Sequence, residues 1–210
     1  METHENTKQK ILKTATNLFA YKGFNSVSVR EICKKAGVSL CMISYYFGGK
    51  QELYHAIIDD LIKKQTQYAH TFFDFSLDPR TLEKQEQVDL LGQLLERFID
   101  FFYSNISEDL ILLLLEEQQN PKFNAKTPAF DYLSKVVAAV FNMEENSKEA
   151  VYQNLFIISQ INCLRIFPAF SIRLLGQDSF NQEDITIVKS NIKRYINLML
   201  KDKNIGGSLK

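Results

Sequence analysis

The sequence predicts an all-α fold of about nine helices, and three observations over its 210 residues predict it. Apolar side chains recur at i, i+3 and i+4 spacing along most of the chain, which is the period of an amphipathic helix. Pairs of a capping residue and proline, at Asp78-Pro79 and Thr127-Pro128, are typical of helix starts. No stretch alternates apolar and polar residues over the length of a β-strand.

The first helix is predicted over about 7–22, where Ile11, Ala15 and Phe19 fall on one face. Gly23 ends it. Together with the next two helices it would form a small bundle with few apolar residues to bury, which is marginal alone. We therefore expect this bundle to lean on the long helix that follows it in the chain.

The stretch 28–50, with the sequence SVREICKKAGVSLCMISYYFGGK, predicts two short helices joined by a tight turn. Ser28 and Glu31 have the S-x-x-E spacing of a capping box. Gly37 can adopt the left-handed backbone that stops a helix, and Ser39 can cap the next helix. This pattern predicts a helix-turn-helix whose second helix would enter the major groove of DNA.

Six further helices are predicted from the same signals. Asn120-Pro121 should break one of them, and Pro168 should kink or end the most apolar one. The tail IGGSLK is expected to fray. The predicted ranges are about 50–73, 79–103, 107–119, 127–141, 148–170 and 181–201.

The charge is unevenly distributed, although the formal net charge of the whole chain is zero. Residues 1–55 hold eight Lys and Arg and four Asp and Glu, a formal charge of +4. Residues 56–210 hold seventeen and twenty-one, a formal charge of −4. A basic N-terminal part fits local attraction to phosphates.

The remaining sequence features exclude several classes of protein. The polar start is not a signal peptide, and the longest apolar run, 110–115, is too short to span a bilayer, so we expect a cytoplasmic protein. No nucleotide fingerprint, catalytic motif or metal-ligand spacing is present, so we expect no enzyme, no cofactor and no metal. The three cysteines, which cannot all pair, are Cys33, Cys41 and Cys163.

The run GVSLCMISYYFGGKQELY resembles the signature of the TetR family of bacterial transcriptional regulators. The matching positions are Gly37, Val38, Ser39, Ile43, Tyr46, Phe47, Lys50 and Leu53. ILKTATNLFAYKGF and SVSVREICKKA resemble the family's first two helices, so the likeness covers about residues 7–55. The chain departs from the pattern at Ser44, where the family usually has a Tyr that touches the DNA backbone, and Tyr45 can replace it.

The resemblance implies a helix-turn-helix head of three helices, residues 1–49, and a helical ligand-binding and dimerisation domain, residues 50–210. Members dimerise commonly through their last two long helices, here 148–170 and 181–201. We expect a homodimer on a pseudo-palindromic operator in double-stranded DNA, a repressor that a small-molecule effector releases. Activation, a helical adaptor, and a constitutive DNA-binding protein without an effector are the alternatives.

The resemblance also implies roles for single residues at the DNA. Arg30 stands where the family often reads a base, which a bidentate contact to guanine would suit. Leu40, Cys41 and Met42 begin the recognition helix and favour thymine methyl groups, because they are apolar. Phosphate contacts are expected from Ser28, Tyr45, Tyr46 and Lys50, although Tyr46 can instead close the small core. The full expected set is Ser28, Arg30, Ser39, Leu40, Cys41, Met42, Ser44, Tyr45, Tyr46 and Lys50.

Aromatic residues in the later helices predict an apolar pocket with a few polar groups, the usual form of a ligand site. The expected lining is Phe98, Phe102, Phe130, Gln160, Asn162 and Arg165. Such a pocket favours a neutral or weakly polar organic effector, and an anionic one if Arg165 faces the cavity. Arg165 can instead lie in the core or at the dimer interface, or pair with Glu116 or Glu117.

Overall fold

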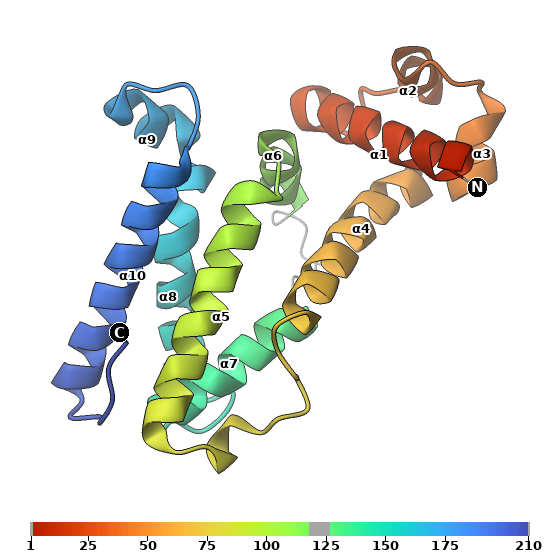
Figure 1. Cartoon of the computed structure of the whole chain (residues 1–210). Helices are drawn as coiled ribbons and strands as arrows, with labels where there is room; N and C mark the ends of the chain where they lie inside the picture. The colour runs from red at the N-terminus through yellow and green to blue at the C-terminus, as the bar shows by residue number, and fades with distance from the viewer. Residues whose placement is uncertain (1, 118–126, 210) are drawn as a thin grey trace. The chain divides into compact units, whose positions relative to one another are not determined.

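The computed structural model of the chain describes residues 2–117 and 127–209 (Figure 1). These residues form ten α-helices and one 3-10 turn, η1, and they contain no β-strand, so the predicted all-α fold is confirmed. The elements are α1 (Glu2–Lys22), α2 (Val29–Ala36), α3 (Cys41–Phe47), α4 (Lys50–His70), η1 (Pro79–Thr81), α5 (Lys84–Ser104), α6 (Glu108–Glu117), α7 (Pro128–Val140), α8 (Lys148–Ile166), α9 (Pro168–Leu175) and α10 (Gln182–Asp202).

The predicted number of helices was one too low, because α9 was not foreseen. Pro168 does end α8, as expected, but it also occupies the first position of a new helix. Proline fits there because its missing N–H would have no partner in the first turn of a helix. Gly176 ends α9 in the left-handed conformation, with φ of 66°.

The predicted start of the fifth helix at Asp78-Pro79 was also wrong. The Asp78 side chain does cap a helix, by accepting from the Arg80 N–H at 2.9 Å, but that helix is the single turn η1. α5 has its own capping box, in which the Glu83 N–H donates to Glu86 Oε2 at 2.9 Å. A cap-then-proline signal therefore marked the position of a helix start without marking its length.

The chain folds into two compact units, which are described separately. The first unit contains α1–α3, α4 up to Lys64, and α6. Its core joins α1 to α2 and α3, and Leu53 and Ile57 of α4 and Leu113 of α6 complete it. The helix after the head thus supports it as predicted, whereas the part taken by α6 was not foreseen. The main buried side chains are Ile11, Leu18, Phe19, Ile32, Ile43, Leu53, Ile57 and Leu113.

Polar contacts also hold α6 in the first unit. Asn17 Nδ2 of α1 donates to Asp109 Oδ2 at 3.0 Å, and the Lys35 ammonium donates to Asn17 Oδ1. The Tyr54 hydroxyl donates to Glu117 Oε2 at 2.6 Å, and burial together with this carboxylate raises the pKa of Tyr54. The division between the two units does not fall at residues 49 and 50, and the predicted functional boundary there stays a prediction.

The second unit contains the rest of α4 with α5 and α7–α10. α5 packs against α7 and α10, and α8 packs against α7 and α10. Arg165 of α8 is buried and donates to the carbonyls of Phe102 and Ile106 at the end of α5. A cation at these carbonyls is favourable because the C-terminal end of a helix carries partial negative charge.

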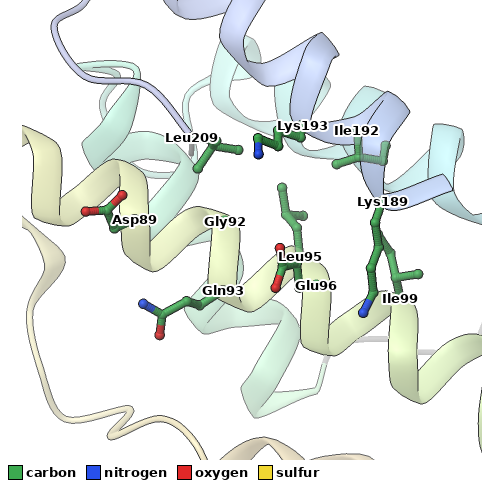
Figure 2. A pocket seen from close by; sticks show the side chains of 10 residues that line it. All are labelled: Asp89, Gly92, Gln93, Leu95, Glu96, Ile99, Lys189, Ile192, Lys193 and Leu209. Atoms are coloured by element: carbon green, nitrogen blue, oxygen red, sulfur yellow. The ribbon is translucent and has the colours of Figure 1, made fainter. Parts of the chain in front are cut away.

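The C-terminal tail, residues 203–209, is anchored rather than frayed, which corrects the sequence prediction. Asn197 of α10 forms two hydrogen bonds with the Leu209 backbone, at 2.8 and 3.1 Å. Gln85 of α5 forms two more with the Ser208 backbone, at 3.0 and 3.2 Å. Leu209 lies so close to Gly92 that a Cβ there would come within 2.5 Å of its side chain (Figure 2).

Candidate nucleic-acid interface and cavities

The turn between α2 and α3 has the local structure that its sequence predicts. Ser28 is extended and its hydroxyl accepts from the Glu31 N–H at 3.2 Å. A 2.5 Å bond from the Lys22 ammonium, helped by the Ser28 N–H, lowers the pKa of Glu31. Gly37 adopts φ of 65°, and its N–H bonds the last carbonyls of α2. The start of α2 is therefore fixed by the side chain of Ser28 and its end by the backbone of Gly37, two residues that the sequence pattern had indicated.

α3 begins one residue later than expected, and Ser39 is not its side-chain cap. Leu40 takes the cap position without a side-chain bond, and Ser39 Oγ lies 3.1 Å from Cys41 Sγ. Ile43 is fully buried and fixes the inner side of the helix. The outer side is a reading face made of Leu40, Cys41, Ser44 and Tyr45.

The reading face and the side chains on α2 are exposed together in the first unit. Tyr45 is 73% exposed, and Arg30 and Ser28 are also exposed. Arg30 has the reach and the five donors that a base or phosphate contact needs. Seven of the ten residues expected at DNA are thus accessible: Ser28, Arg30, Ser39, Leu40, Cys41, Ser44 and Tyr45.

The other three expected residues turn toward the protein. Met42 and Tyr46 are half-buried and pack against the core of the first unit. The packing of Met42 against the core disfavours the base contact predicted for it, which stays a prediction. The structure also favours the core interpretation of Tyr46, which the sequence had left open.

Lys50 has a structural role that the sequence did not reveal. Its ammonium donates to the carbonyls of Phe24 and Val27, each at 2.9 Å, and lies 4.2 Å from the centre of the Phe24 ring. Two of its three N–H donors are thus used to hold the loop between α1 and α2. This geometry leaves little of the ammonium for the phosphate contact that was expected.

Two lysines of α1 were missing from the expected set. Lys10 is exposed, and its ammonium lies 3.6 Å from the point where a Cβ would stand on Gly37. Lys8 is exposed and lies 5.8 Å from the centre of the Phe47 ring, at the end of α3. The sequence showed that the start of the first helix is basic. Only the structure shows that α1 packs so that these lysines lie beside the helix-turn-helix.

The second unit contains a small apolar cavity between the end of α4, α5 and α7. It encloses about 40 Å³. Phe98 and Phe130 line it, as expected, together with Tyr68, Phe73, Phe101 and Arg97. The Arg97 guanidinium lies 4.1 Å from the centre of the Phe72 ring.

The other expected ligand residues do not line this cavity. The Phe102 ring stacks parallel to Phe98 at 6.1 Å, next to the Arg165 guanidinium. Gln160 is exposed and Asn162 is half-buried on α8. The buried position of Arg165 at the end of α5 answers the question that the sequence left open, in favour of the core.

Two wider grooves lie elsewhere in the second unit. The α5–α10 groove, of about 220 Å³, has Leu209 of the tail at one side and carries Glu96 and Lys193 on its two helices (Figure 2). The α7–α8 groove encloses about 430 Å³. None of the helices in the described ranges is long and apolar enough to cross a membrane. Residues 2–117 and 127–209 contain no cluster of three His, Cys, Asp or Glu side chains that suits a metal ion.

Comparison with known proteins agrees with this arrangement. Residues 11–57 match the family model of bacterial regulatory proteins of the TetR family. The probable HTH-type transcriptional regulator YttP of Bacillus subtilis is 39% identical over 82 residues, which are 39% of this chain and 38% of that protein. The HTH-type transcriptional dual regulator CecR of Shigella flexneri is 23% identical over 213 residues, which cover 94% of this chain and 92% of that protein.

A solved structure shows that the similarity in fold extends over nearly the whole chain. A transcriptional regulator from Aquifex aeolicus has a TM-score of 0.57 at 20% identity, over 92% of this chain and 99% of that one. The helix-turn-helix of α2 and α3, the family match over it and this common fold agree with one another. Residues 11–57 are thus the DNA-binding part of a bacterial regulatory protein of the TetR family, and the relatives that match the chain are HTH-type transcriptional regulators.

Proposed function

We propose that the protein is a homodimeric repressor that binds a pseudo-palindromic operator and that a small organic molecule releases. The observation that carries the DNA-binding part is the exposed reading face of α3 beside Arg30, Lys8 and Lys10. Apolar and hydroxyl groups on such a face contact base edges, and the flanking cations hold phosphates. A repressor of this kind acts on the chromosome, in the bacterial cytoplasm.

An exposed apolar face supports dimerisation. Its large side chains lie on α8, α9 and α10, and α8 packs beside α10 (Figure 1). So many large apolar side chains in water on neighbouring helices are typical of an interface, because a monomer would leave them exposed. The dimer face comprises Val151, Tyr152, Leu155, Phe156, Leu164, Phe167, Phe170, Leu174, Ile187 and Leu198.

Light scattering and a DNA mobility shift test the dimer. The wild type should be a dimer at micromolar concentration and should bind one duplex that holds two half-sites. Leu198, which is 57% exposed, can be changed to Asp without removing core packing, and Leu198→Asp should give monomers that bind the operator weakly. Gln182→Asp, an exposed site outside the face, is the charge-matched control. A wild type that stays monomeric would contradict the proposal.

The apolar cavity supports effector control. A cavity lined by aromatic rings with one cation, Arg97, has the polarity that suits a neutral or weakly polar organic molecule, but at about 40 Å³ it must widen before it can hold one. Such a ligand releases DNA only if it prefers a conformation whose two reading faces no longer match the half-sites. The test is a compound screen that follows operator binding and thermal stability together, since a bound ligand stabilises the fold by mass action. If no compound changes either signal, the protein binds DNA constitutively.

Transcription from the operator tests the direction of control. A reporter under the bound promoter should rise when the gene is deleted and fall when it is restored. A reporter that falls on deletion would identify an activator. This experiment separates the sign of control from DNA binding, which the mobility shift measures alone.

A further inference from the structure

The α7–α8 groove has a polar floor beside an apolar wall. Ser134 of α7 and Asn154 of α8 supply the polar groups, and Phe130, Ala150 and Leu155 supply the apolar wall. With about 430 Å³ it is wide enough for a small organic molecule. Of these five residues, only Phe130 belongs to the set that the sequence suggested for ligand binding.

The side chain of Asn154, which lines the groove, is held in a fixed orientation by hydrogen bonds. Asn154 is 3% exposed, and its Nδ2 donates to Ser134 Oγ at 2.6 Å. The Ser134 hydroxyl in turn donates to the Phe130 carbonyl at 3.0 Å. Because the only proton of Ser134 is used there, its oxygen must accept from Asn154, so the amide oxygen cannot take that place.

Asn154 Oδ1 is consequently left without a donor. It is buried, and no described residue donates a hydrogen bond to it. Buried polar atoms in folded proteins nearly always have a partner, because an unpaired one keeps the full cost of losing water. Asn154 also lines the groove, so an occupant whose N–H or O–H group reaches the buried Oδ1 would supply the missing partner.

Phe130 connects this groove with the apolar cavity. The residue lines both spaces, and its carbonyl is the acceptor that orients Ser134. An occupant of the groove therefore contacts a residue that also lines the apolar cavity. The polar groove and the apolar cavity thus share one lining residue.

We propose that the α7–α8 groove binds the head group of a small amphipathic molecule, whose hydroxyl or amino group donates a hydrogen bond to Asn154 Oδ1. Its short aliphatic part packs against Phe130 and Ala150, because Leu155 belongs to the dimer face proposed above. This inference deepens the effector control proposed above. It rests on that proposed function only for the claim that the bound molecule changes DNA binding. Binding itself is measured on the free protein, so failure of either idea can be recognised separately.

The charged residues of the groove do not select a ligand by its charge, so the hydrogen bond to Asn154 must determine which ligand binds. Asp131, Lys135 and Glu145 are exposed and carry both signs, and Glu145 lies 3.7 Å from Arg80. Neither a cation nor an anion is therefore favoured by charge alone. A ligand of either charge that lacks a donor should bind weakly, because it leaves Asn154 Oδ1 without a partner.

Four probes with the same six-carbon chain test the proposal by calorimetry and thermal shift. Hexanol and hexylamine carry a donor, hexyltrimethylammonium carries the charge without a donor, and hexanoate carries only acceptors. We expect hexanol, hexylamine or both to bind roughly tenfold or more tightly than the other two. Which of the two donors binds distinguishes an alcohol from an amine as the ligand class.

Two variants locate the binding. Asn154→Leu keeps the size of the side chain and removes the acceptor, so it should abolish the preference for hexanol and hexylamine. Thr66→Val is the matched control, because Thr66 Oγ1 is also a buried oxygen without a partner but does not line the groove. Thr66→Val should retain the preference in full.

Three results would overturn the proposal. One is equal binding of all four probes, which would show apolar contact alone. Another is no binding of any probe up to about 10 mM, which corresponds to a Kd weaker than the millimolar range. In that case a water molecule or a second copy of the chain, docked through Val151 and Leu155 of the dimer face, fills the groove. The third is a donor preference that survives Asn154→Leu.

Discussion

The ammonium of Lys50 lies 4.2 Å from the centre of the Phe24 ring and donates a 2.9 Å hydrogen bond to the Phe24 carbonyl. A second bond, to the Val27 carbonyl, ties the first residue of α4 to the loop between α1 and α2. A signature position of the family thus serves the internal structure of the head in this chain. The distinction matters because a phosphate contact and an internal contact fail in different ways when the lysine is removed.

Lys50→Ala should destabilise the protein by about 2 kcal/mol, because it removes two charge-assisted hydrogen bonds and a cation–π contact from a half-buried site. Urea unfolding measures the loss. Lys34→Ala, at an exposed position of α2, is the control and should change stability by less than about 0.5 kcal/mol. Unchanged stability together with a smaller salt dependence of DNA binding would restore the phosphate role of Lys50.

Arg30→Ala should relax the sequence preference of DNA binding at one position and weaken operator binding by roughly 1–3 kcal/mol. Arg30 is exposed on α2, so its removal leaves the core intact. Binding to operator and random duplexes, followed by fluorescence anisotropy, measures both effects. An equal loss on both duplexes would show that Arg30 contacts phosphate and reads no base.

Lys10→Ala should weaken operator and random DNA alike and lower the slope of log K against log salt by about one unit. The reason is the position of the Lys10 ammonium beside Gly37 in the turn that precedes α3. A salt titration of the DNA affinity measures the slope. Lys201→Ala removes the same charge at an exposed position of α10 and should leave the slope unchanged.

Alkaline pH should destabilise the protein through Tyr103. Burial raises the pKa of this hydroxyl to about 12, and the hydroxyl donates to the Ile161 carbonyl at 3.0 Å. Below about pH 10 the tyrosine is protonated in both the folded and the unfolded chain, so its contribution to stability is complete. Between about pH 10 and 12 only the unfolded chain ionises, and the free energy of unfolding falls as the pH rises.

Tyr103→Phe provides the comparison for this pH effect. The variant should be about 1 kcal/mol less stable at neutral pH, because it lacks the hydrogen bond to Ile161. Its stability should then fall less steeply than that of the wild type above about pH 10. Parallel curves of unfolding free energy against pH would show that Tyr103 ionises with an ordinary pKa.

Gly92→Ala should loosen the C-terminal tail. An added Cβ would lie 2.5 Å from Leu209 Cδ2, so the leucine must move and weaken the bonds that Asn197 makes with its backbone. Hydrogen exchange of the Leu209 amide should accelerate about tenfold, which corresponds to the loss of one hydrogen bond. Gly206→Ala is the control, because no heavy atom lies within 4 Å of its Cβ position. Unchanged exchange in Gly92→Ala would mean that the leucine moves without releasing the tail.

Local signals in the sequence were sufficient for most of the helices and for the turn before α3. Ser28, Gly37 and Thr127 act within a few residues of themselves, so their roles follow from spacing alone. The extent of η1 and the existence of α9 did not follow, because a proline at a helix start does not state how long the helix is. The length of a helix depends on which of its apolar side chains pack against other helices in the folded chain.

The candidate sites were less predictable because they depend on contacts between distant residues. Lys50 and Phe24 are separated by 26 positions, and the residue type of Lys50 suits a phosphate as well as two carbonyls. Arg165 donates to the carbonyls of Phe102 and Ile106, which lie 63 and 59 positions earlier in the chain. These bonds hold it in the core, so it does not line the cavity that was expected. The acceptor on Asn154 depends on the proton of Ser134, and no pattern along the chain indicates such a relay.

The exposure of Cys41 on the reading face makes α3 accessible to chemical labelling. Cys33 is buried, so maleimide reagents should modify only Cys41 and Cys163, and Cys163→Ser leaves a single accessible thiol. A bulky adduct on Cys41 would occupy the space where a base pair must approach α3. Operator DNA should conversely slow the alkylation of Cys41, so the rate of thiol modification becomes a footprint of the bound complex.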